Sequence, residues 1–172
     1  MNTDQKTINS LHDLLHYDAR KFTYGEILLQ DHLAKWVIKA TSVKLKICIQ
    51  KYQVFVDQHI KKLENFFVEE NINSLSVNNY VMKAFIKELN EKLDQCNDPE
   101  VADACILAGI QAINHLKISL YGTAAAFAKE TGIEKYAGIF HEAEVNEKQI
   151  DDRLTQLAEH EINAIAKTRI GL

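Results

Sequence analysis

The feature that most restricts the fold of this sequence is the scarcity of residues that interrupt helices. The chain has 172 residues, with a single proline and six glycines. Proline and glycine are the residues least favourable in helix interiors. Apolar residues recur three or four positions apart over four stretches of about 25–30 residues each, with no strand-like alternation. We therefore predict an all-α protein built from long helices.

Local start and stop signals divide the chain into four long helices and a shorter one. Ser10, with Asp13 three residues later, resembles a capping box. Asp98 can cap a helix whose first position is Pro99, and Gly132 suits the end of that helix. The predicted helices are residues 10–40, 43–69, 80–94, 99–130 and 134–167, in one domain covering residues 1–172.

The connection between the second and third long helices suggests how the helices are joined. Residues 10–67 form one helical hairpin and residues 99–167 form another, with a long link between them. This order is typical of a ferritin-like up-down four-helix bundle with a long crossover, here containing the short extra helix. The predicted core stripes include Leu11, Leu15, Phe22, Leu29, Leu33, Trp36 and Ala40 in the first helix, and Phe140, Ala143, Ile150, Leu154, Leu157, Ile162 and Ile165 in the last.

Charge and cysteine content narrow the functional classes. A net charge of −4 gives no electrostatic reason to expect nucleic-acid binding. No apolar run approaches the roughly 20 residues of a membrane span, and the N-terminus lacks a secretory signal pattern. Cys48, Cys96 and Cys105 form no CxxC motif and are expected to be reduced thiols. We expect a cytoplasmic protein.

Polar residues interrupt the apolar stripe of each long helix near its middle. The interruptions are Glu26 in the first helix, His59 in the second, Asn114 and Lys117 in the third, and Glu147 followed by Asp151 in the fourth. Four-helix bundles hold dinuclear metal sites through inward carboxylates and imidazoles contributed by all four helices. The mid-helix positions allow these residues to share one level of the bundle.

Each of these residues also has a structural interpretation. His59 fits a hydrogen-bonded packing residue at the edge of the core, and this is the favoured interpretation. Glu147 and Asp151 could equally form a solvated strip of the last helix. Glu26 lies within its apolar stripe, where an unpaired buried carboxylate would be costly, so an inward role with a partner is favoured.

A separate histidine pair lies near the start of the first helix. His12 and His16 are four residues apart, a spacing that can hold a metal ion. No acidic third ligand can be assigned to them, so a surface face is the favoured interpretation. The sequence contains no Glu-x-x-His or HExxH motif, no glycine-rich phosphate loop and no nucleophile elbow.

Several segments together resemble the YciE/YciF-like family of ferritin-like proteins. The resemblance covers roughly residues 10–165. The matching segments are Tyr24-Gly25-Glu26, Ala40-Thr41-Ser42, Asp98-Pro99-Glu100-Val101, Gln111, His115, Tyr121-Gly122-Thr123 and Glu147 to Asp151. The resemblance implies a ferritin-like bundle, a homodimer, and a loose association with bacterial stress responses without a defined activity.

The chain departs from the family pattern at the presumed dimetal ligands. Glu26 and Asp151 are kept, and Asn146-Glu147 stands where the family has Glu-Glu. The second helix carries Val54-Phe55-Val56 in place of Glu-Glu-Thr, and the third carries Asn114-His115-Leu116-Lys117 in place of Glu-His-Tyr-Glu. Two helices have thus lost carboxylates, and a lysine has replaced one of them.

We interpret this pattern as a degenerate ferritin-like protein. Lys117, with Asn114, would compensate the remaining core charge, so no catalytic residue, metal or cofactor is expected. The expected role is non-enzymatic, structural or stress-associated, in a homodimer. The alternative is a di-iron or dimanganese oxidase or iron-handling protein using the residual candidates Glu26, His59, Glu147 and Asp151. A further alternative is an adaptor that binds an unknown protein partner through Tyr80, Phe85 and Ile86, although packing of this short helix on the bundle is the favoured use of these residues.

Overall fold

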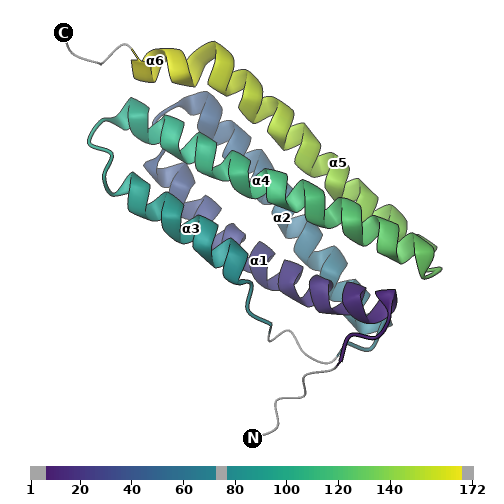
Figure 1. The fold of residues 1–172 in the computed structure, drawn as a ribbon. Helices are drawn as coiled ribbons and strands as arrows, with labels where there is room; N and C mark the ends of the chain where they lie inside the picture. Colours follow the sequence, from purple (N-terminus) through teal and green to yellow (C-terminus); the bar gives the residue numbers. More distant parts are fainter. Residues whose placement is uncertain (1–6, 73–76, 168–172) are drawn as a thin grey trace, which may run out of the picture.

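Four long helices form a bundle in this structure, a computed structural model that describes residues 7–72 and 77–167. The elements are α1 (Leu11–Lys39), α2 (Val43–Glu69), α3 (Tyr80–Leu93), α4 (Pro99–Glu130), α5 (Glu134–Leu157), a π-helical turn η1 (Ala158–Ile162) and α6 (Asn163–Lys167). The pairs α1–α2 and α4–α5 are helical hairpins, and α1 and α2 also pack on α4 and α5, respectively (Figure 1). The all-α prediction is confirmed in the described residues.

The short helix α3 lies outside the four-helix bundle and packs on α1 and α4 (Figure 1). Trp36 of α1 donates a hydrogen bond to Asn90 of α3 at 2.9 Å. Ile86 is buried in this contact, whereas Tyr80 is exposed. The crossover helix is therefore anchored to the bundle, as its apolar stripe predicts.

The helix ends follow the predicted capping signals. The Ser10 hydroxyl accepts a hydrogen bond from the Asp13 amide at 3.0 Å. Asp98 accepts from the amides of Glu100 and Val101 at 2.9 and 3.1 Å. These side chains satisfy amide groups that have no partner within the helix.

The last predicted helix, 134–167, is interrupted by the π-helical turn. Leu157 and Ile162 are both buried, although they are five residues apart. Regular α-helical spacing would bring His160 or Glu161 toward the core instead. The π-turn is closed by a hydrogen bond from the Asn163 amide to the Ala158 carbonyl, and it turns Ile162 toward the core. Beyond it Ile165 is exposed, as is Leu11 at the start of α1, because both lie at the ends of the bundle.

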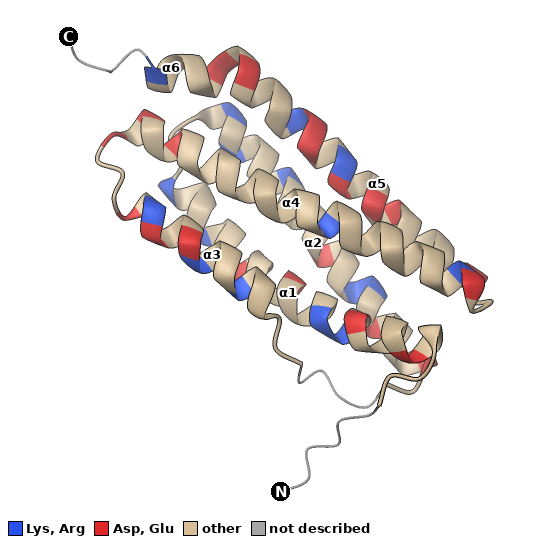
Figure 2. Ribbon diagram, in the orientation of Figure 1, with Lys and Arg blue, Asp and Glu red and all other residues tan. Residues whose placement is uncertain are grey.

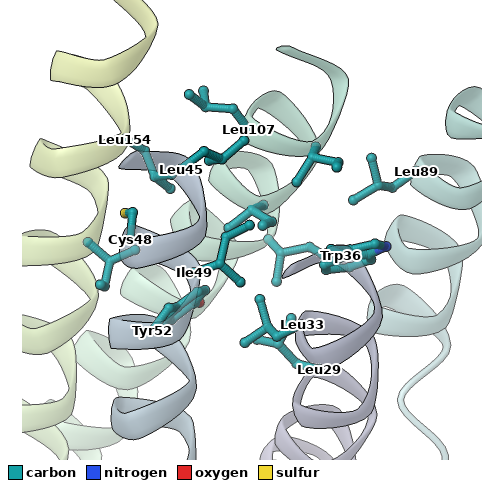
Figure 3. Close-up of a cluster of buried hydrophobic side chains, with 14 of the residues drawn as sticks. Leu29, Leu33, Trp36, Leu45, Cys48, Ile49, Tyr52, Leu89, Leu107 and Leu154 are labelled. Carbon is teal, nitrogen blue, oxygen red and sulfur yellow. The ribbon is translucent and has the colours of Figure 1, made fainter. Parts of the chain in front are cut away.

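The apolar core consists of two clusters placed one after the other along the bundle. The Trp36 cluster includes Leu29, Leu33 and Trp36 of α1, which face Ile49 and Tyr52 of α2 (Figure 3). The Phe66 cluster includes Leu15, Phe66, Tyr121, Tyr136 and Phe140. Figure 2 shows that α4 carries few charged residues between its ends, whereas α5 carries acidic and basic residues along its length. This difference fits the contacts of α4, which packs on α1, α3 and α5.

None of the helices described combines the length and the apolar character needed to cross a bilayer.

Candidate functional site: a buried ion-pair layer

A layer of charged and polar side chains separates the two apolar clusters. Each long helix contributes one of its central members: Glu26 from α1, His59 from α2, Lys117 from α4 and Glu147 from α5. All four are between 0 and 2% exposed. The structure therefore brings four of the residues singled out in the sequence to one level of the bundle.

Lys117 lies at the centre of this layer. Its Nζ atom is 2.9 Å from Glu26 Oε2 and 2.6 Å from Glu147 Oε1. Among the described residues, no neutral hydrogen-bond donor reaches these two carboxylate oxygens. The ammonium also donates to the Tyr52 hydroxyl at 3.2 Å. One cation therefore links the carboxylates of two helices that face each other across the bundle.

The other oxygens of the two carboxylates accept hydrogen bonds from neutral groups. The Tyr121 hydroxyl donates to Glu26 Oε1. The Tyr52 hydroxyl and the Asn114 amide donate to Glu147 Oε2 at 2.6 and 2.7 Å. Asn114 also donates to the Glu147 backbone carbonyl at 3.0 Å, which fixes α4 against α5. Buried charges are tolerated when such bonds satisfy them.

Tyr52 and Tyr121 had no predicted role in a site. Both belong to apolar stripes, and their rings fill the core like any aromatic side chain. The available signal was the hydroxyl group, because a buried tyrosine usually has a hydrogen-bond partner. Both tyrosines lie near the positions where polar residues interrupt the apolar stripes. Their hydroxyl groups could therefore have been predicted to donate hydrogen bonds to the buried carboxylates.

His59 combines packing with a weaker electrostatic contact. Its ring lies against Tyr121 at a centroid distance of 5.1 Å and is stacked on Phe55 at 6.5 Å. Its Nδ1 atom is 3.4 Å from Glu26 and 3.5 Å from Glu147, and neither ring nitrogen makes a hydrogen bond of regular geometry. His59 therefore faces both carboxylates without being bonded closely to either.

The pKa values of the layer are set by burial and by the position of one cation, Lys117, between two carboxylates. Burial alone would raise the pKa of Glu26, but Lys117, His59 and Tyr121 together lower it to about 2. At Glu147, burial and the nearby Glu26 charge outweigh the attraction of Lys117, and the pKa is raised. Burial opposes the charge of Lys117, but both carboxylates favour it, so its pKa is raised. Lys117 thus favours the charged form of both carboxylates. Together with His59 and Tyr121 it outweighs burial at Glu26, whereas at Glu147 it does not.

The residues present do not fit the dinuclear metal centre that the family resemblance implies. Glu26, His59 and Glu147 do offer donor atoms within 4.8 Å of one another. However, the Lys117 ammonium contacts both carboxylates where a bridging cation would contact them. The usual set contains carboxylates from all four helices. Here α4 contributes Asn114 and Lys117 to the layer, and α2 contributes His59.

Asp151, the fourth residual metal candidate, takes part in a different contact. Its Oδ1 atom accepts a hydrogen bond from Gln111 at 2.9 Å and lies 2.8 Å from His115 Nε2. His115 is exposed and Asp151 is partly buried, so this contact lies at the α4–α5 surface. Four residues beyond Glu147, Asp151 lies about 6 Å further along α5 and about 40° around it, and Ile150 takes the inward position instead.

Comparison with known proteins agrees with this fold and places the chain in a family. Residues 10–167 match the family described as Domain of unknown function (DUF892). Protein YciF of Escherichia coli (strain K12) is 33% identical over 101 residues, covering 59% of this chain and 61% of that protein. The sequence match thus spans less than two thirds of that relative.

Two solved structures are similar over most of their length. The E. coli stress protein YciF has a TM-score of 0.83 and 26% identity, covering 93% of this chain and 99% of that one. YcfI from Rhodopseudomonas palustris, described as a candidate structural protein, has a TM-score of 0.83 and 27% identity, covering 88% and 96%. The resemblance to YciF-like proteins is confirmed, and the chain belongs to the DUF892 family.

Proposed function

We propose that this protein is a degenerate ferritin-like bundle with a non-enzymatic, structural role. The observation that carries the proposal is the position of Lys117 Nζ, 2.9 Å from Glu26 and 2.6 Å from Glu147. An ammonium can neutralise two inward carboxylates, but it offers no open coordination position for a substrate or dioxygen. The core layer would then hold the bundle together as a permanent ion pair.

The surroundings of Lys117 support this role. Tyr52, Tyr121 and Asn114 donate hydrogen bonds to the carboxylate oxygens that do not face the ammonium. Burial and the neighbouring carboxylates raise the pKa of both tyrosines well above the usual value, so their hydroxyl groups stay protonated and continue to donate. The layer therefore has donors for its carboxylates without a metal ion.

The relatives suggest a biological setting. One is called a stress protein, and the other a candidate structural protein. We propose that this chain acts likewise as a cytoplasmic, stress-associated homodimer that works through association. Light scattering should then give twice the chain mass of 19.6 kDa.

The decisive experiment compares metal retention by two forms of untagged protein. Wild-type protein and the variant Asn114→Glu/Lys117→Glu, which restores acids at two positions of the layer, are incubated with Fe(II) or Mn(II) and desalted. Each form is also prepared with the additional change Glu26→Gln. Core-bound metal is defined as the metal that is retained without this change and lost with it. We expect core-bound metal in the restored variant and none in the wild type.

Stoichiometric core-bound iron or manganese in the wild type would overturn the proposal. It would instead support the di-iron or dimanganese alternative, and oxidation with dioxygen would be the next assay. Circular dichroism of each variant checks that the bundle is folded, because two additional buried acids are destabilising in the absence of metal.

A further inference from the structure

A second cluster of metal-ligating side chains lies where the start of α1 meets the end of α2 (Figure 1). His12 and His16 belong to the first turns of α1, and Glu70 is the residue that ends α2. The Nε2 atoms of His12 and His16 lie 3.0 and 3.1 Å from the same atom, Glu70 Oε2. The fold thus supplies the acidic third group that the histidine pair lacked in the sequence.

The spacing of these atoms suits a small divalent ion. All three donor atoms lie within 4.8 Å of one another. With zinc–ligand bonds of about 2.0–2.2 Å, neighbouring donors around a tetrahedral ion are about 3.3–3.6 Å apart. The observed separations of 3.0 and 3.1 Å are shorter than this range by a few tenths of an ångström. Small side-chain rotations would therefore admit an ion between the two imidazoles and the carboxylate.

The backbone around Glu70 is held in place by its own hydrogen bonds. The Ile72 amide bonds to the Phe67 carbonyl at 2.9 Å, and the Asn71 amide faces the Val68 carbonyl at 3.4 Å. Asn71 has a φ of 53°, the left-handed conformation that completes this helix-ending motif. Glu70 is consequently presented to α1 from a defined helix end.

The histidines are also positioned by packing. The His16 ring meets the edge of the buried Phe66 ring at a centroid distance of 5.8 Å. The His12 and His16 rings are 4.0 Å apart and tilted by 49°, which allows both to point their Nε2 atoms at one carboxylate oxygen. Such positioning reduces the conformational entropy that would be lost on binding an ion.

The cluster differs from the core layer in charge and in access. In the described residues, the ion-pair contacts of Glu70 are with the two histidines, while the nearby Lys135 pairs with Glu69. The side chains of His12, His16 and Glu70 are 45, 16 and 20% exposed. An ion can therefore reach the cluster from solvent and keep a water ligand.

We propose that His12, His16 and Glu70 bind one divalent transition-metal ion of the zinc type. Two imidazole nitrogens and a carboxylate oxygen are the donors that such borderline ions prefer, whereas magnesium and calcium prefer oxygen ligands. Three protein ligands with one position left for water is a common zinc arrangement. The ion would clip the first turns of α1 to the end of α2, independently of the core layer.

The test is calorimetric titration of untagged, chelator-treated protein with Zn(II), and with Mg(II) for comparison. We expect one equivalent of zinc, no magnesium binding, and a rise in Tm with zinc. His16→Phe keeps an aromatic ring against Phe66 but removes both nitrogens, and Glu70→Gln removes the charged ligand. Each change should weaken zinc binding at least about tenfold and abolish the Tm rise.

Two control variants make the result specific. His141 pairs with Glu144 at 3.2 Å on the surface of α5, a single-histidine pair that should not hold an ion, so His141→Phe should leave zinc binding unchanged. Glu26→Gln should also leave it unchanged. The proposal would be overturned if zinc binding were not saturable, or if wild type, His16→Phe and Glu70→Gln bound zinc equally. The cluster would then be only a set of hydrogen bonds between α1 and the end of α2. Zinc lost specifically in Glu26→Gln would instead place the ion in the core and count against the proposed function.

Discussion

Two clusters in this protein contain nearly the same chemical groups but balance their charge differently. The core layer has Glu26, His59 and Glu147, and the helix-end cluster has His12, His16 and Glu70. The core carboxylates are paired with a lysine from the chain itself. The carboxylate at the helix ends faces two histidines and solvent. The difference shows that burial determines whether the chain must supply a permanent cation of its own.

The physical reason is the cost of removing charge from water. An uncompensated ion in a dry interior is far less stable than one at the surface, so two adjacent buried acids require a counter-charge. At a partly exposed site, water and mobile ions screen the charge. The core layer is thus suited to a permanent ion pair, and the helix-end cluster can accept an exchangeable ion.

The largest effect is expected when the core cation is removed. Lys117→Met should lower the free energy of unfolding by about 3–5 kcal/mol, because it leaves two carboxylates buried without their counter-ion. Urea denaturation measures the change. Adding Glu147→Gln to this variant removes one of the two acids and should recover part of the loss. A change below about 1 kcal/mol for Lys117→Met, the size found for exposed pairs, would remove the contrast between the clusters.

Lowering the pH should reduce the stabilisation provided by the same ion pair over several pH units. Because the folded pKa of Glu26 is lowered from 4.5 to about 2, its contribution is present above pH 4.5 and is lost as the pH falls toward 2. The loss is at most about 3 kcal/mol by linkage. Glu147, whose pKa is raised, acts in the opposite direction and offsets part of it. Urea denaturation between pH 7 and pH 3 should show a smaller loss of stability on acidification in Glu26→Gln than in wild type. Equal losses would contradict the lowered pKa of Glu26.

A third carboxylate extends the comparison because, among the residues that the structure describes, its partners are hydroxyl and amide groups and not a lysine. Asp103 of α4 accepts hydrogen bonds from the Thr41 amide, the Thr41 hydroxyl and the Ser42 amide at 2.8, 2.6 and 2.7 Å. These dipoles tie the α1–α2 turn to α4. Asp103→Ala should cost about 2–3 kcal/mol in urea denaturation, since three hydrogen bonds to a carboxylate are lost and the partly buried amides of Thr41 and Ser42 lose this acceptor. Asp152→Ala, at an exposed position of α5, is the control and should have little effect.

The smallest effect is expected at the helix-end cluster without metal. In the presence of a chelator, Glu70→Gln should change the free energy of unfolding by less than about 1 kcal/mol, because the pairs with His12 and His16 are partly solvated. The measurement is again urea denaturation, at neutral pH. A loss comparable to that of Lys117→Met would show that the two clusters do not differ in the way burial predicts.

Much of the core layer could be predicted from the sequence because helical periodicity is a local property. Glu26, His59, Lys117 and Glu147 interrupt apolar stripes whose inward direction is set by a period of 3.6 residues. All four point into the bundle. The same periodicity placed Asp151 near them, but Ile150 takes the inward position of that turn and Asp151 lies at the α4–α5 surface, beside Gln111 and His115.

Other contacts could not be predicted because they depend on how distant segments approach. Leu11 and Ile165 belong to apolar stripes but are exposed, because they lie at the ends of the bundle. The π-turn at Ala158–Ile162 arises where the fourth stripe would otherwise turn His160 or Glu161 inward. Tyr52 and Tyr121 acquire their hydrogen bonds only when carboxylates 95 residues away in sequence are brought beside them.

The sequence by itself determined the long helices, the caps at Ser10 and Asp98 and most of the inward-facing positions, because these depend on neighbours within a few positions along the chain. Only the tertiary structure decided which charges meet. Lys117 became a counter-ion because the helix arrangement places it between Glu26 and Glu147. His12 and His16 gained Glu70 from 58 and 54 residues away because the α1–α2 hairpin returns the chain to its start. Electrostatic interactions depend on distance in space, and the fold sets that distance.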